Sequence, residues 1–435
     1  MNNSIEKVKN HIKQLATSGS ITKMNSQNIL GFVAQLEAQG HSKGPYSKNR
    51  IKKYLYGLGS LCQILDKDFD KATRDDMNIL ASKIRNKYAK ETSRDYLVIL
   101  RLFIKYIWEL KGYEYEENQF PDIIKKIKPG NKQPTKVKRT QLLSMDDINK
   151  IANITTNLRD RCFVIMLFET GCRISELIGD EEHEPIKLRD IKTDQYGTIV
   201  DVDGKTGLRS LRLIASGPAI ANWLQEHPDK NNPDAPLFCC IWGKKRGKKI
   251  GYQYWNDLLT GKSDNRKRKT DKKVPMLGLG EKVGINKPMT PHHFRHSRAS
   301  ELAKFMTESQ LCYYLGWEQG SKQARTYVHL SGKDVDSAIL KMHGRIPEED
   351  NEKNKMNPIQ CPRCNRENDP FAKYCSWCSL LLDEKSIATF EKEKEQASKF
   401  GFDIKVLMEN KEFRLKMMNM MALEFEKYMK KNEID

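Results

Sequence analysis

The chain has 435 residues and a formal net charge of +19, which predicts two or more domains and favours a polyanionic partner, nucleic acid before a membrane surface. A charge excess that only keeps the protein in solution is the alternative. No window approaches eighteen apolar residues and no charged-then-apolar signal segment opens the chain, so we expect a cytoplasmic, nucleoid-associated protein without a membrane partner.

Residues 1–115 show only helical patterns, and we expect them to form a small helical bundle. Four amphipathic helices are predicted, because apolar residues recur at intervals of three and four between short polar turns. The residues that mark these four helices are Ser26, Tyr54, Thr73 and Tyr96.

Basic side chains gather at the start of the second of these helices and in the stretch after the bundle. The helix carries Lys48, Arg50, Lys52 and Lys53. Residues 116–140 have no apolar period and contain prolines and a glycine, so they are predicted to be a basic linker. Its candidate phosphate contacts are Lys136, Lys138 and Arg139. Both groups are candidate contacts to duplex DNA, although a solvated helix face is the simpler explanation of the first.

A second domain is expected to begin near residue 141. Ser144 and Asp147 have the spacing of a capping box at the start of a helix. Farther along, Arg173 and Glu176 stand three residues apart in the otherwise apolar run GCRISELI. Such a pair in a helix is either a structural ion pair or part of a site, and the pair alone leaves both explanations open.

A hairpin and a basic insertion follow. Residues 198–202 and 210–214 are predicted strands, and the turn between them carries Lys205. Residues 242–287 are rich in Lys and Arg and interrupted by glycines, so a long loop or insertion that contacts DNA is predicted there. The candidate contacts within it are Lys267, Arg268 and Lys269.

The stretch 289–327 holds residues with more specific chemistry. His292 and Arg295 are three residues apart, so they share one face of a helical turn and can together hold an anion. A run with helical periodicity continues to Leu315, and Trp317 follows directly after a glycine.

Three tyrosines in this region compete for a role as an oxygen nucleophile. Tyr313 and Tyr314 lie within the apolar helical run, which predicts that both are core residues. Tyr327 lies beyond that run, and its hydroxyl is therefore the preferred candidate.

Four cysteines near the C-terminus form the pattern CxxC-x10-CxxC, which supplies four thiolates for a tetrahedral zinc ion. They are Cys361, Cys364, Cys375 and Cys378. Residues 358–383 are therefore predicted to be a zinc ribbon with one structural Zn²⁺, while the other six cysteines stay reduced. Because the ribbon has no core of its own, we expect Cys375→Ser to unfold it and leave the preceding domain folded.

Two more helical segments lie on either side of the ribbon. The first is a short amphipathic helix after Tyr327, with apolar positions at Val335, Ala338, Ile339 and Met342. The second is residues 384–435, a helical tail of mixed charge that is predicted to be an interaction segment.

The motifs in their order along the chain, GCRISEL, a lysine in a hairpin turn, PHHFRHS, LGW and TYVHLS, resemble the tyrosine recombinase (phage-type integrase) family over residues 141–345. The resemblance implies a multidomain, mainly α protein with a helical core-binding bundle, an α+β catalytic domain with a small hairpin sheet, the ribbon and the tail. It also implies a set of six catalytic residues, Arg173, Lys205, His292, Arg295, Trp317 and Tyr327. Glu176 is expected to support this set, and His293 and His296 are expected to lie beside it.

The same resemblance implies an enzyme that cuts and rejoins double-stranded DNA through a 3′-phosphotyrosine bond, without ATP or a catalytic metal. A homotetramer on synapsed DNA is expected, with residues 335–342 packed either on a neighbouring protomer or on their own domain. Two other functions remain open: a catalytically idle DNA-binding protein on the same fold, and a DNA-relaxing enzyme similar to type IB topoisomerases.

Overall fold

A computed structural model describes residues 4–40, 44–116, 118–131, 138–261, 277–330 and 356–383, with isolated positions at 343, 345, 388 and 392. The chain divides into two compact units, Met1–Val137 and Lys138–Asp435. None of the helices in the described ranges has both the length and the apolar character needed to cross a membrane.

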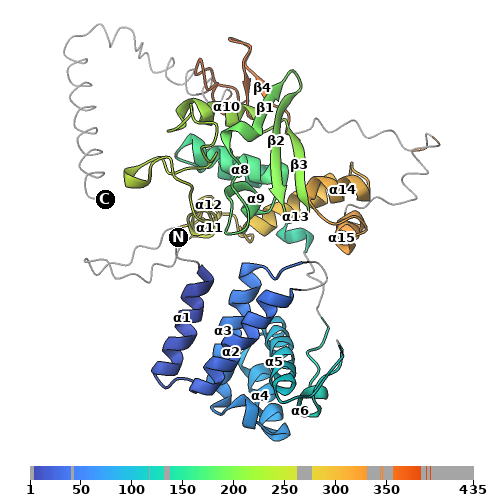
Figure 1. Ribbon diagram of the computed structural model, residues 1–435. Helices are drawn as coiled ribbons and strands as arrows, with labels where there is room; N and C mark the ends of the chain where they lie inside the picture. Colours follow the sequence, from blue (N-terminus) through green and yellow to red (C-terminus); the bar gives the residue numbers. More distant parts are fainter. Residues whose placement is uncertain are drawn as a thin grey trace. The chain divides into compact units, whose positions relative to one another are not determined.

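The first unit is a helical bundle (Figure 1). Its helices are α1 (Ser4–Thr17), α2 (Lys23–Gln39), α3 (Lys48–Leu65), α4 (Arg74–Lys87), α5 (Lys90–Leu110) and α6 (Asp122–Lys125). The sequence predicts four of them and misses α1 and the short α6. In α1, the buried residues Ile5, Val8 and Ile12 are separated by charged and polar ones. Helix α2 begins earlier than its predicted marker, Ser26. Thr22 caps it by accepting a hydrogen bond from the Asn25 N–H.

The stretch predicted to be a linker begins with ordered structure. Ile124, in α6, and Ile127 are buried in the core of the first unit. Lys138 and Arg139 are exposed at the start of the second unit, whereas Lys136 lies outside the described residues. The packed part of residues 116–140 therefore belongs to the bundle.

The second unit holds the remaining elements (Figure 1). Its helices are α7 (Met145–Ile154), α8 (Leu158–Thr170), α9 (Ile174–Ile178), α10 (Gly217–Glu226), α11 (Tyr252–Thr260), α12 (Leu279–Lys282), α13 (Pro291–Leu302), α14 (Glu308–Leu315) and α15 (Lys322–Leu330). Its strands are β1 (Ile191–Asp194), β2 (Gly197–Gly204), β3 (Gly207–Leu213), β4 (Ile359–Gln360) and β5 (Glu367–Asn368).

Helix α8 is the centre of this unit and packs against α7, α10, α13 and β3. It is buried on almost all sides, and residues 162–168 are all apolar, as expected of a helix surrounded by protein. Near its end the Glu169 carboxylate accepts hydrogen bonds from the backbone N–H groups of Ile214 and Ser216, both at 2.7 Å. Gly171, with φ of 56°, ends α8 in the left-handed conformation and turns the chain toward Arg173.

The sheet is antiparallel with the order β1-β2-β3. Pairing of β2 with β3 runs from Thr198↔Leu213 to Gly204↔Gly207, so Lys205 and Thr206 form a two-residue turn. The predicted hairpin is present with longer strands, and β1 adds a third strand that the sequence does not predict.

The predicted continuous helical run up to Leu315 is broken into α13 and α14. Thr307 starts the second helix by accepting a hydrogen bond from the Gln310 N–H, and Phe305 in the break is 78% exposed. Residues 335–342 and the tail after residue 392 lie outside the described residues, as do Lys267, Arg268 and Lys269.

Candidate active site

Arg173 and Glu176 form an ion pair at the start of α9. Arg173 occupies the N-cap position, and its Nη1 donates to Glu176 Oε1 at 2.8 Å and to the Gly316 carbonyl oxygen at 3.1 Å. Glu176 is 2% exposed, and its Oε2 accepts a hydrogen bond from the Arg173 backbone N–H at 3.0 Å. The pair is therefore structural, and it also fixes a guanidinium that remains partly exposed.

Arg295 projects from α13 into the interior and is 5% exposed. Its guanidinium donates to two carbonyl oxygens, Gly171 O at 2.9 Å and Leu315 O at 2.6 Å. Burial, with the neighbouring charge of Arg173, lowers the pKa of Arg295 to about 10. A buried cation held only by carbonyls and next to a second cation is a site that favours an anion.

Tyr327, in α15, lies beside this guanidinium. Its ring stacks on that of Trp317 with centroids 5.4 Å apart, and the Arg295 guanidinium lies 5.1 Å from the centroid of the same indole. The Tyr327 hydroxyl hydrogen-bonds with Nδ1 of His296. Burial raises the pKa of Tyr327 to about 12, so its hydroxyl is protonated at neutral pH.

The two remaining members of the predicted set, His292 and Lys205, lie in different surroundings. His292 is close enough to Arg295 and Arg173 that, after burial, their charges further lower its pKa. Lys205 is exposed in the β2–β3 turn. The residue before it, Gly204, lies against Glu176, because a Cβ at this position would be 2.5 Å from Glu176 Oε1.

The structure gives one expected neighbour a specific contact and adds one residue that the sequence does not assign to this cluster. His296, which the resemblance places beside the set, contacts the Tyr327 hydroxyl. Arg209, in β3, is 4% exposed and donates to Glu176 Oε2 at 2.7 Å. An arginine at a buried position of an alternating strand was the signal there.

One prediction about the rival tyrosines is wrong and one is confirmed. Tyr314 packs against the core and donates its hydroxyl to the Glu169 carbonyl at 3.1 Å. Tyr313 is 57% exposed, because the break before α14 rotates the helix relative to the continuous run assumed from the sequence.

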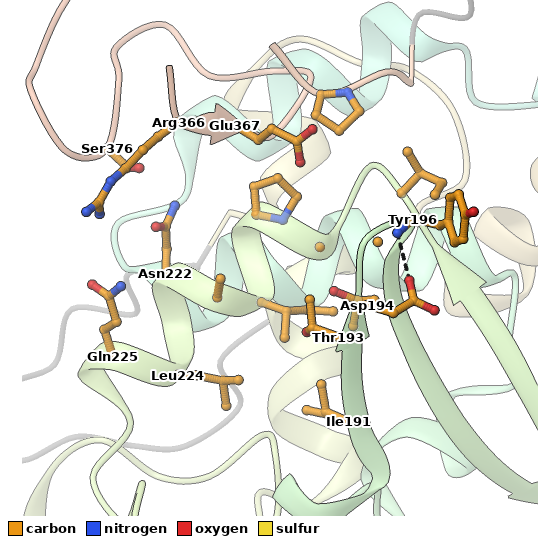
Figure 2. A pocket seen from close by; sticks show the side chains of 18 of the residues that line it. Ile191, Thr193, Asp194, Tyr196, Asn222, Leu224, Gln225, Arg366, Glu367 and Ser376 are labelled. Carbon is orange, nitrogen blue, oxygen red and sulfur yellow. Dashed lines mark hydrogen bonds between the residues drawn. The ribbon is translucent and has the colours of Figure 1, made fainter. Parts of the chain in front are cut away.

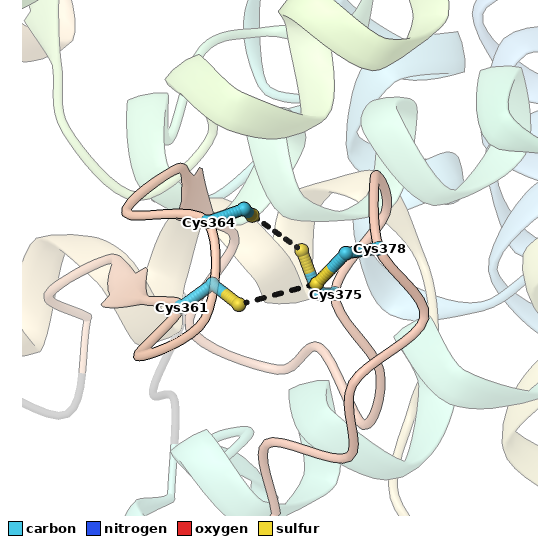
Figure 3. A group of neighbouring side chains, drawn as sticks. All are labelled: Cys361, Cys364, Cys375 and Cys378. Carbon is cyan, nitrogen blue, oxygen red and sulfur yellow. Dashed lines mark hydrogen bonds between the residues drawn. The ribbon is translucent and has the colours of Figure 1, made fainter.

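The four cysteines of the C-terminal pattern converge on one point (Figure 3). Their sulfur atoms all lie within 4.8 Å of one another, and Cys361 Sγ to Cys378 Sγ is 3.5 Å. A tetrahedral Zn²⁺ with bonds of about 2.3 Å sets its ligand sulfurs about 3.8 Å apart. The donor set fits zinc.

This four-cysteine element packs against the rest of the second unit. Asp369 is 4% exposed, and both its carboxylate oxygens accept from Arg161 of α8, at 2.7 and 3.0 Å. Phe371 and Met356 are buried in the same core as α8. The element therefore shares a core with α8, so its unfolding should also affect the stability of the preceding domain.

A pocket of about 550 Å³ separates part of the cysteine element from β1, the β1–β2 turn and α10 (Figure 2). Arg366 and Trp377 line it on one side, and Asp194 and Asn222 on the other. None of its lining residues belongs to the Arg173–Tyr327 cluster, so the two features are separate.

The phage integrase family model matches residues 141–333, which contain this cluster. The tyrosine recombinase XerA of Pyrococcus horikoshii is 23% identical over 321 residues, covering 73% of this chain and 94% of that protein. The tyrosine recombinase XerC of Leptospira interrogans is 24% identical over 310 residues, covering 68% and 88%. A crystal structure of the XerH site-specific recombinase bound to palindromic difH substrate matches 77% of this chain and 95% of that one, with 17% identity and a TM-score of 0.48.

Proposed function

Because residues 141–333 belong to the phage integrase family, this chain is a site-specific tyrosine recombinase, and we propose that Tyr327 is the nucleophile with which it cuts and rejoins DNA. The matches do not favour the two alternatives, an idle DNA-binding protein and a relaxing enzyme similar to type IB topoisomerases.

The observation that carries the proposal is the charge imbalance around Arg295. Among the described residues of the cluster, Arg173, Arg209 and Arg295 are balanced by a single carboxylate, Glu176. A DNA phosphate bound between Arg173 and Arg295 supplies the missing negative charge. In a site with little water, such preorganised donors stabilise the additional charge of a phosphoryl transition state without a metal ion.

The reaction follows from this arrangement. The Tyr327 oxygen attacks phosphorus, the bond to the 5′-oxygen breaks, and the 3′ end remains on the enzyme as a phosphotyrosine. The Tyr327 proton passes to Nδ1 of His296, and Lys205 protonates the leaving 5′-oxygen. Attack by the 5′-hydroxyl of another strand reverses these steps and completes strand exchange, so no ATP is consumed.

His296 is suited to accept the proton only when it is neutral. Burial, with the adjacent His293 and His292, lowers the pKa of His296 to about 4, so its ring is uncharged at neutral pH. The negative charge of a bound phosphate raises this pKa and makes the ring a better base when substrate is present. The resemblance places His292 in the catalytic set, but among the described residues His296 is the histidine in contact with the Tyr327 hydroxyl.

Lys205→Ala should slow cleavage of ordinary DNA by about 10²–10⁴, the usual contribution of a general acid. A substrate with a 5′-phosphorothiolate should restore much of the rate, because a thiolate leaves without a proton. Single-turnover cleavage measures both rates. The exposed Lys192 in β1 provides the control, and equal loss on the two substrates would show that Lys205 is not the acid.

We propose that the basic start of α3 contacts the DNA backbone, together with Lys138 and Arg139. Lys48, Arg50 and Lys53 are exposed there, with Lys52 half-buried beside them. Arg50 is already held in place, with its guanidinium 4.9 Å from the ring centroid of Tyr46. Ordering it on a phosphate therefore costs little conformational entropy.

Neutralising Lys48, Arg50 and Lys53 with glutamine should reduce the slope of log affinity against log salt concentration by about 0.9 per lost phosphate contact. The matched control neutralises three exposed lysines elsewhere on the bundle, Lys7, Lys13 and Lys23. Equal slopes for the two triple variants would mean that net charge, rather than a local contact, drives binding.

We propose that four copies act together. Exchange between two duplexes breaks four phosphodiester bonds, and each copy contributes one Tyr327. Residues 335–342 are the segment proposed to connect neighbouring copies. Because both substrates are DNA, the enzyme acts at the nucleoid.

We propose that the four cysteines hold one structural Zn²⁺ in a zinc ribbon. The convergence of the four sulfur atoms supports this assignment. Zinc bound by four thiolates has no open position for substrate, so its contribution is to stability and not to the chemistry.

A further inference from the structure

The side chain of Arg209 connects three parts of the candidate active site. It lies in β3, four residues after Lys205, and donates through Nη2 to Glu176 Oε2 at 2.7 Å and through Nε to the Tyr314 carbonyl at 3.1 Å. With 4% exposure, it is not placed to contact DNA. Its partners lie on α9 and at the end of α14.

These partners also hold Arg173. Glu176 accepts from Arg173 Nη1 through Oε1 at 2.8 Å, and Arg173 Nη1 also donates to the Gly316 carbonyl at 3.1 Å. Arg209 therefore touches Glu176, which orients Arg173, and the turn at residues 314–316, which leads into Trp317.

Two glycines leave room for this arrangement. A Cβ at Gly204 would be 2.5 Å from Glu176 Oε1, and a Cβ at Gly316 would be 2.7 Å from Arg209 Nη1. Gly316 also has φ of 63°, which favours glycine. The hairpin end that carries Lys205 and the turn before Trp317 are thus packed tightly around the Arg209–Glu176 pair.

We propose that Arg209 is a positioning residue of the recombinase: it holds the Glu176 carboxylate that fixes Arg173 and joins the Lys205 hairpin to the Trp317 turn. This inference rests on the proposed function. Arg209 contributes to the cleavage rate through Arg173 and leaves the affinity for DNA unchanged.

The proposal predicts a specific pH dependence. Glu176 faces Arg173, Arg209, Arg295 and the thiol of Cys172, which is neutral because burial raises its pKa to about 11. Burial alone would raise the pKa of Glu176, but Arg209 and Arg173 bring it below its ordinary value. Without Arg209, burial prevails, and Glu176 becomes protonated as the pH falls. Arg173 then loses its anchor at low pH.

The test compares single-turnover cleavage from pH 5 to 9 on a nicked duplex that the unmodified protein cleaves. Such a duplex is obtained by covalent capture from a pool of random sequence. Arg209→Met should bind this duplex with unchanged affinity, cleave it about 10²–10³ more slowly at neutral pH, and lose further rate toward acid. Arg209→Lys should recover most of the rate and remove the acid dependence.

Arg212→Met is the matched control, because Arg212 lies on the same strand and pairs with the partly exposed Asp194 away from the site. Arg209→Met cleaving at the normal rate, or more slowly by one factor at every pH, would contradict a positioning role. If Arg209→Met fails to fold, Arg209→Lys is the deciding variant. A cleavage rate close to that of the unmodified protein, without additional loss toward acid pH, supports the proposal. An Arg209→Lys protein that folds but does not cleave overturns it. If the unmodified protein captures no duplex, the proposed function itself fails.

Discussion

Tyr327→Phe is expected to bind target DNA with normal affinity and to form no covalent adduct with it. Phenylalanine keeps the ring that stacks on Trp317 and removes only the oxygen that is proposed to attack phosphorus. The adduct should fall below detection, since no other described hydroxyl shares the contacts of Tyr327 with His296 and Trp317. Denaturing electrophoresis after incubation with a nicked suicide duplex measures the adduct, and a filter-binding assay measures affinity.

Two variants complete this test. Tyr313→Phe removes a hydroxyl that is exposed and should leave the adduct yield unchanged. His296→Ala keeps the nucleophile but removes its hydrogen-bond partner, so cleavage should slow by about 10²–10⁴ and partly recover at high pH, where solvent can take the tyrosine proton. Normal adduct formation by Tyr327→Phe would refute the assignment.

Removing zinc is expected to destabilise the whole second unit and not only the ribbon. Without the metal, four thiols lose their common partner and the ribbon unfolds. Phe371 and Met356 then leave the shared core, at about 1.5–3 kcal/mol each, and the Arg161–Asp369 ion pair is lost. For a unit of this size the melting temperature should fall by roughly 10 °C. Calorimetry with and without a chelator measures the change.

Two substitutions separate metal binding from docking. Cys375→Ser should lose the zinc and show the full decrease in melting temperature, whereas Cys240→Ser, outside the cluster, should change neither. Asp369→Asn keeps all four cysteines, so it should retain one zinc per chain and show an intermediate decrease. If the second unit melts at the same temperature with and without zinc, the docking contacts contribute nothing to its stability.

The sequence predicts the geometry of the candidate site well where it depends on residue type and local spacing. Arg173 with Glu176, and Arg295 three residues after His292, are local pairs whose geometry follows from a single helical turn. The hairpin turn at Lys205 follows from the two strands on either side of it.

The contacts that the sequence misses lie between distant elements. Arg209 reaches Glu176, 33 residues away in the chain, because the β2–β3 hairpin packs against α9 through β2. His296 reaches Tyr327 only because α15 packs against α13. The docking of the ribbon through Arg161 and Asp369 joins residues 208 positions apart, which no local pattern contains.

The most direct test of the account is to identify the amino acid that carries DNA after cleavage. The unmodified full-length protein is incubated with nicked duplexes of random sequence, the covalent complex is digested with protease and nuclease, and the modified peptide is sequenced by mass spectrometry. We expect a single nucleotide, linked to Tyr327 through its 3′-phosphate. A modified Tyr313 or Tyr314, or a linkage through a 5′-phosphate, would contradict it.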